Sequence, residues 1–144
     1  MHPVSRILVA VSSPWASEKL AKPIADLAER LRCEVLITHV ARLQDTDEEE
    51  SAMSERGEQT IERLASLLRT RGIKCDGVML FEDHSDPAKL ILQTAHAKGC
   101  TAIALGLASK GATKRLVSGD MPASIIRQSD LPVLLLPANW DGNL

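Results

Sequence analysis

The sequence predicts an α/β fold in which a doubly wound, five-stranded parallel sheet carries helices on both faces. Five short apolar runs alternate with longer segments whose apolar residues recur every three or four positions. The runs are nearly continuous, which is typical of strands that are buried on both faces. Because the connections have helical length, parallel pairing with right-handed crossovers is favoured. The five runs are residues 6–11, 34–40, 77–81, 101–106 and 132–137.

Four helices are expected between these strands. The first has its apolar positions between Leu20 and Leu31, and Pro23 within it should kink the helix or delay its regular start. The third opens with Asp86 as a cap and Pro87 in the first helical position. The second is expected from Met53 to near Gly72, the third stops at Gly99, and the fourth covers residues 122–128.

Length and composition exclude several classes of protein. The 144 residues are expected to form one domain, and with 2% aromatic residues its core must be aliphatic. A net charge of -2 provides no basic footprint for nucleic acid. No apolar run approaches the length of a membrane span, and the N-terminus lacks the apolar stretch of a signal peptide. We therefore expect a cytoplasmic protein with neither a nucleic-acid nor a membrane partner.

The three cysteines do not form a recognisable site. Cys33, Cys75 and Cys100 are odd in number and show no CxxC spacing, which argues against a disulfide framework or a zinc site. Each precedes a predicted strand, at the end of the sheet opposite the one where such folds bind ligands. They are therefore expected to be small buried hydrophobic residues with reduced thiols.

In an open parallel sheet, ligands bind at the carboxyl ends of the strands, near the point where the strand order reverses. Four segments are expected there: residues 12–15, His39 with Val40, residues 82–85, and the loop 106–120. That loop has glycine near both ends and contains Lys110, Lys114 and Arg115. Glycines and basic side chains are typical of phosphate-binding loops, although a basic cluster in an exposed loop is also typical of a solvated surface.

Four quoted stretches make the chain resemble the universal stress protein family over nearly its whole length: "RILVAV", "ITHV", the glycine-containing loop after "TAIALG", and "SDLPVLLLP". The resemblance implies an adenine-nucleotide alpha-hydrolase-like sheet with strand order 3-2-1-4-5 and a role in stress adaptation. It also implies a homodimer, often paired through the last strands. In one branch of the family, ATP or AMP lies on the loop after the fourth strand, with the pattern GxxGx9G followed by Ser or Thr and an Asp after the first strand.

This chain departs from the nucleotide pattern at three of its five positions. Ser109 replaces the second glycine, Asp120 replaces the hydroxyl residue, and Ser12 replaces the Asp. A carboxylate before the last helix can accept the free N–H groups of that helix and repel a phosphate. The candidate nucleotide residues are Ser12, Val40, Leu105, Gly106, Ser109, Gly119 and Asp120.

Two functions follow from this comparison. The first is a regulator that binds ATP weakly or not at all, has no resident cofactor, does not act as an enzyme, and works through protein contacts. The alternative is an ATP- or AMP-binding switch, in which Lys110, Lys114 and Arg115 restore the attraction for phosphate. A homodimer is expected in either case, because a short apolar edge strand invites pairing with a second chain. Its contact residues would be Val133, Leu134, Leu135 and Leu136, and Trp140 either packs across the interface or lies in a loosely held tail.

Other residues expected at the ligand edge have simpler explanations than metal binding or catalysis. His39 and His84 either form a metal pair or are structural, and a hydrogen-bonded histidine at a strand end is the favoured reading. Ser12 and Ser13 lack the GxSxG context of a nucleophile, so helix capping is preferred. The acidic residues 45–50, DTDEEE, favour the dipole of the following helix or form a docking segment for a partner.

Overall fold

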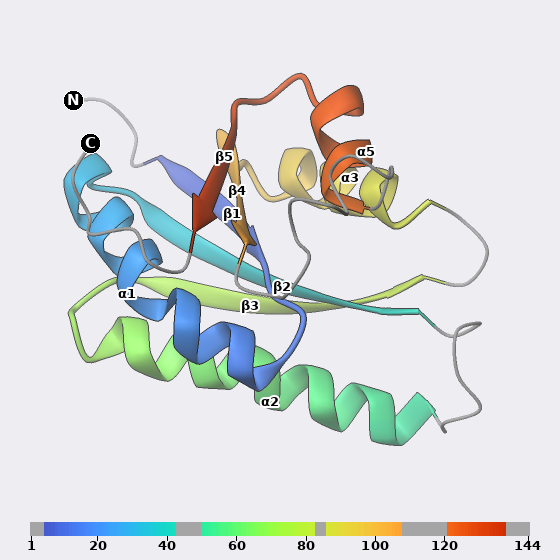
Figure 1. Ribbon diagram of the computed structural model, residues 1–144, viewed down its shortest axis with the longest axis horizontal. Helices are drawn as coiled ribbons and strands as arrows, with labels where there is room; N and C mark the ends of the chain where they lie inside the picture. The colour runs from blue at the N-terminus through green and yellow to red at the C-terminus, as the bar shows by residue number, and fades with distance from the viewer. Residues whose placement is uncertain (1–4, 43–49, 83–85, 108–120, 138–144) are drawn as a thin grey trace.

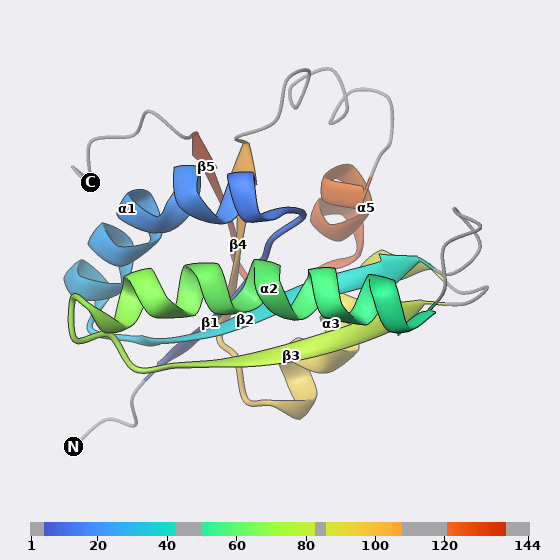
Figure 2. The same ribbon diagram turned by 90° about the horizontal axis from the view of Figure 1, so that it is seen from below.

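The computed structural model describes residues 5–42, 50–82, 86–107 and 121–137 (Figure 1). In these residues five parallel strands form one sheet in the order β3-β2-β1-β4-β5. Helices α1 and α2 cover one face and α3 and α5 the other, as the perpendicular view shows (Figure 2). The predicted fold class and strand order are therefore confirmed. The strands are β1 (Arg6–Ala10), β2 (Glu34–Arg42), β3 (Cys75–Glu82), β4 (Ala102–Leu107) and β5 (Val133–Pro137).

The four described helices are α1 (Pro14–Leu31), α2 (Glu50–Arg69), α3 (Pro87–Ala97) and α5 (Met121–Gln128). In α3 the predicted cap is confirmed, since the Asp86 carboxylate accepts a hydrogen bond from the Ala88 N–H at 3.0 Å. None of the described helices combines the length and the apolar character needed to cross a membrane.

Of the two effects expected of Pro23, a kink or a delayed start of the helix, the delayed start does not occur in α1. The helix begins at Pro14, and the Ser13 hydroxyl accepts the Ala16 N–H at 3.1 Å. Pro23 lies inside the helix and is buried. The cap, together with the burial of side chains such as Leu20 and Ile24 on either side of Pro23, outweighs the one backbone hydrogen bond that proline cannot donate.

Strand boundaries differ from the prediction by up to two residues. β2 continues to Arg42, and β3 begins at Cys75 and ends at Glu82. The reason is the pairing itself, because Cys75 lies opposite Val35 and Glu82 opposite Arg42. A polar residue can extend the hydrogen-bonded pairing of two strands beyond their apolar residues. The apolar run alone therefore does not show where a strand ends.

Two aliphatic cores lie on opposite faces of the sheet. Alternate residues of each strand point to opposite sides, so Ile7 and Val9 pack under α1 and α2 while Leu8 packs under α3 and α5. The three cysteines are buried and free at or just before the amino ends of their strands, as predicted. Burial raises the pKa of each thiol, so these residues stay neutral.

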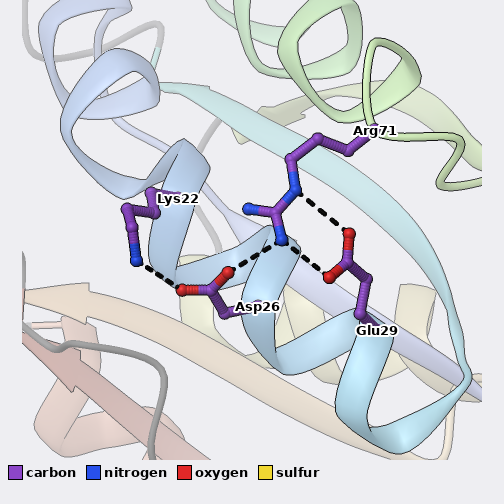
Figure 3. A network of polar contacts seen from close by, with 4 residues as sticks. All are labelled: Lys22, Asp26, Glu29 and Arg71. Carbon is purple, nitrogen blue, oxygen red and sulfur yellow. Dashed lines mark hydrogen bonds and ion pairs between the residues drawn. The ribbon is translucent and has the colours of Figure 1, made fainter.

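Four charged side chains connect α1 to the turn between α2 and β3 (Figure 3). The Arg71 guanidinium donates to both carboxylate oxygens of Glu29, at 3.0 and 2.7 Å, and to Asp26 at 2.8 Å. Lys22 donates to the other oxygen of Asp26 at 2.8 Å. Hydrogen bonds from Lys22 and Arg71 lower the pKa of Asp26, and those to Glu29 and Asp26 raise the pKa of Arg71. We call these four residues the Arg71 clamp.

Candidate functional site

The candidate site lies where the strand order reverses. β1 is flanked by β2 on one side and β4 on the other, and the chain proceeds outward in opposite directions from these two strands. The carboxyl ends of β1 and β4 are therefore neighbours at the position where folds of this type bind ligands. Ala10, the last residue of β1, lies opposite Leu105 of β4. Ser12 follows two residues after Ala10, so Ser12, Leu105 and Gly106, three of the predicted site residues, lie at this end of the sheet.

These three residues differ in what they offer a ligand. Ser12 is exposed, so its hydroxyl is available at the mouth of the site. Leu105 is almost completely buried in the core under α3 and α5, and Val40 is half-buried on that same face. Leu105 and Val40 can therefore present only backbone groups or an apolar wall. The neighbouring Ser13 caps α1, which confirms the capping interpretation of the serine pair.

Gly106 has a packing role that the sequence pattern did not predict. A Cβ atom at this position would collide with the side chain of Leu20 in α1, whose Cγ would lie only 2.8 Å away. The glycine thus permits α1 to cross closely over the end of β4. The left-handed glycines of the described chain are Gly72 and Gly99, so Gly106 is not required here for a positive φ.

His39 is structural in the way predicted for a strand-end histidine. Its Nδ1 atom lies 2.9 Å from the carbonyl oxygen of Val11, and since a carbonyl only accepts, Nδ1 carries the hydrogen. The imidazole packs under α2 at Gly57, where a Cβ would approach within 2.8 Å of the ring. His84 lies outside the described residues. Within the described residues no group of three or more His, Cys, Asp or Glu side chains could hold a metal ion.

The remaining predicted site residues also lie outside the described part of the chain. They are Ser109, Gly119 and Asp120, together with the basic residues Lys110, Lys114 and Arg115. The segment that contains them starts after Leu107, the last residue of β4, and ends before Met121, the first residue of α5.

Residues 3–137 match the model of the universal stress protein family. The chain belongs to this family. No curated protein matches the chain. Among solved structures, a universal stress protein from Archaeoglobus fulgidus has a TM-score of 0.69 and 22% identity, with 91% of this chain and 92% of that chain covered.

Two further solved structures contain adenine nucleotides. A universal stress protein from Archaeoglobus fulgidus in complex with dAMP has a TM-score of 0.68 and 17% identity, covering 94% of this chain and 98% of that chain. A universal stress protein family protein from Arabidopsis thaliana with AMP bound has a TM-score of 0.61 and 16% identity, covering 95% and 94%. At these identities the likeness concerns the fold.

Two features of this universal stress protein were missed by sequence reasoning. Trp15, in the first turn of α1, is 50% exposed, and the Lys19 ammonium lies 5.9 Å from its ring centroid. Glu82, at the end of β3, is fully buried. Proximity to the predicted ligand edge was a signal for both. However, the sequence gives no indication that a tryptophan beside the edge is exposed or that a carboxylate within it is buried.

Proposed function

We propose that this universal stress protein acts by binding rather than by turnover, and that its adenine-nucleotide site is weak. The observation that carries the proposal is the position of Asp120, which directly precedes Met121, the first residue of α5. The first N–H groups of a helix attract anions, and a carboxylate adjacent to them in the chain competes for those groups.

The size of the effect supports weakened binding. Two unit charges at 4 Å repel by about 1 kcal/mol in bulk water and by about 4 kcal/mol at an intermediate dielectric constant. Ser12 adds a second loss, because a hydroxyl is a weaker acceptor than the carboxylate of the family pattern. Nucleotides bound to proteins of this fold support the choice of ligand class.

The test is a calorimetric titration of the protein with ATP and AMP, with and without magnesium. Asp120→Ser restores the hydroxyl of the family pattern and should tighten binding about tenfold, which corresponds to 1.4 kcal/mol. Asp76→Ser, at an exposed position of β3, is the matched control for loss of one acidic charge and should bind like the wild type. Equal or weaker binding by Asp120→Ser contradicts the proposal.

The alternative function is an ATP- or AMP-dependent switch, and the nucleotide-bound neighbours favour it. In that case Lys110, Lys114 and Arg115 draw the phosphates to the loop despite Asp120. The two functions differ in the state of the purified wild-type protein. A switch with a tight site releases a nucleotide absorbing near 260 nm on denaturation, whereas the weak site proposed first releases none.

We also propose that the protein is a homodimer paired through β5. This strand is an edge of the described sheet, and its outer positions are apolar. Leu135 is 37% exposed, and Val133 and Leu134 are half-buried. An apolar edge strand of this kind is normally covered by a partner, and a twofold axis supplies the same strand from a second copy. Leu136 is buried in the core and stabilises β5 from within.

A further inference from the structure

A groove of about 320 Å³ lies between α2 and β3, at the sheet edge opposite β5. Both views show α2 running alongside β3 (Figures 1 and 2). We call it the β3 groove. Its floor is apolar and its wall on α2 carries charge. It is lined by Glu58, Ile61, Glu62, Ala65, Arg69, Gly77 and Met79.

The backbone of β3 offers hydrogen-bonding groups to this groove. The Lys74 carbonyl accepts from Val35 of β2, so residue 74 and every second residue after it direct their backbone groups to β2. The intervening residues, among them Gly77, Met79 and Phe81, direct their N–H and C=O groups away from the sheet. In the described part of the chain no strand pairs with this edge.

Gly77 keeps the groove shallow enough for a chain to reach the backbone. A Cβ here would collide with Ile61 of α2, so glycine permits the close packing of α2 on β3. It also leaves the outward backbone of this position without a covering side chain. The exposed ring of Phe81 extends the apolar surface toward the carboxyl end of the strand.

The charges of α2 are divided between its two sides. Arg63 forms an exposed ion pair with Glu18 of α1, so this basic side chain is directed toward α1 and not toward the groove. Glu58 and Glu62 line the groove one helical turn apart, with exposed Glu55 one turn before Glu58. Arg69 ion-pairs with Glu62 at 3.2 Å and neutralises part of this charge, while Glu58 has no ion pair among the described residues.

We propose that the β3 groove docks an extended basic segment of another protein, which joins the sheet as a sixth strand. Its main chain pairs with the outward groups of Gly77, Met79 and Phe81, as in other peptides that add to a sheet edge. Lysine side chains on the α2 side lay their aliphatic stems over Ala65 and Met79 and direct their ammonium groups to Glu58 and Glu62.

The spacing of the two partners agrees with this arrangement. Alternate residues of a strand are about 6.6 Å apart. Glu58 and Glu62 are separated by about 6 Å along the axis of α2. Two lysines on one side of the docked strand therefore meet two carboxylates on the helix.

A second copy of this chain is a poorer occupant of the groove. If two β3 edges paired about a twofold axis normal to the sheet, the two α2 helices would lie on the same side. Glu58 and Glu62 of one copy would then face the same residues of the other, and like charges across an interface oppose association. The acidic wall thus selects a basic partner over self-pairing.

This proposal supplies a class of partner for the binding function proposed above, but it does not require nucleotide binding. The experiment uses the intact protein and a fluorescein-labelled nonapeptide of alternating lysine and valine, with a glutamate–valine nonapeptide as the reverse-charge probe. Fluorescence anisotropy should show saturable binding of the lysine–valine peptide and no binding of the glutamate–valine peptide. No nucleotide is present in this assay. A lack of peptide binding therefore does not bear on the proposed nucleotide site, and the result of the nucleotide titration does not bear on the β3 groove.

Three variants separate the contribution of the charges from that of the backbone. Glu58→Lys combined with Glu62→Lys should weaken lysine-peptide binding at least about tenfold and allow the glutamate peptide to bind. Phe81→Pro removes one outward N–H and should also weaken binding about tenfold, since proline is tolerated at the free side of an edge strand but cannot donate. Phe81→Val loses the ring and keeps the N–H, and should retain most of the affinity.

Amide hydrogen exchange gives the signature of strand addition. The peptide should slow exchange at Gly77, Met79 and Phe81 and leave Val78 and Leu80 unchanged, because their N–H groups already bond to β2. Absence of lysine-peptide binding, or binding without this alternation, overturns the proposal. So does a sedimentation result in which Phe81→Pro dissociates a dimer of the wild-type protein, because the occupant is then a second copy.

Discussion

At the scale of single residues, Gly106 combines a candidate site position with a packing requirement. It follows Leu105, the last β4 residue in register with β1, and lies opposite Leu136 of β5. It also makes room for Leu20 of α1. Sequence spacing predicted the glycine as part of a phosphate loop. It did not predict the contact with Leu20, because that contact depends on how α1 crosses the sheet.

This contact gives a prediction for stability. Gly106→Ala should lower the free energy of unfolding by about 1–3 kcal/mol, since the added methyl group overpacks the interface between α1 and β4. Urea unfolding followed by circular dichroism measures the change. In the double variant with Leu20→Ala the clash is absent, so the two losses should sum to more than the loss in the double variant. Strictly additive losses would show that Leu20 is not the obstacle.

The Arg71 clamp is a feature at the scale of elements, because it connects α1 to the turn between α2 and β3. The folded state lowers the pKa of Asp26, so the carboxylate stabilises the fold fully at pH values above its unfolded-state pKa, about 4. That contribution is lost as the pH falls through the lower pKa of the folded state. Stability should therefore decline on acidification from about pH 5 downward.

Replacement of Arg71 tests whether the clamp causes this dependence of stability on pH. Arg71→Gln should reduce stability at pH 7 by up to about 1 kcal/mol, the range of solvent-exposed ion pairs. The free energy of unfolding of this variant should also fall less steeply on acidification, so that the values for the variant and the wild type converge at about pH 2. Lys89→Gln, which removes an exposed charge from α3, should leave the pH dependence unchanged. A constant difference between Arg71→Gln and the wild type at all pH values contradicts the assignment.

The helices and strands also show how much of the fold could be predicted from the sequence. Apolar runs predicted all five strands, and the capping residue Asp86 with Pro87 located the start of α3. The serine pair predicted a cap before α1, but the sequence did not predict that the helix continues through Pro23, a local helix breaker that is tolerated here because it is buried. The β3 groove was not predicted either. Its acidic wall comes from Glu58 and Glu62 on one helix, but its floor requires the adjacent strand.

At the scale of the whole molecule, the two edges of the sheet have different character. β5 exposes Leu135, while β3 is accompanied by the acidic wall of α2.

Leu135→Lys should convert the proposed dimer to a monomer, because a charged side chain on an edge strand opposes pairing. Sedimentation equilibrium measures the mass. Phe81→Lys is the matched control, with similar exposure on the opposite edge, and should leave the dimer intact. Dissociation by Phe81→Lys and not by Leu135→Lys would place the interface at β3.

In the proposed dimer, the unlike edges also determine where self-assembly would stop. If two copies join through β5 as proposed, the free edges of the described sheets in the pair are the two β3 strands, each bordered by carboxylates of α2. Pairs cannot stack margin to margin into a growing fibre without bringing those acids together. In such a dimer the charge pattern on α2 would limit further assembly, and replacing Glu58 and Glu62 by glutamine should remove that limit.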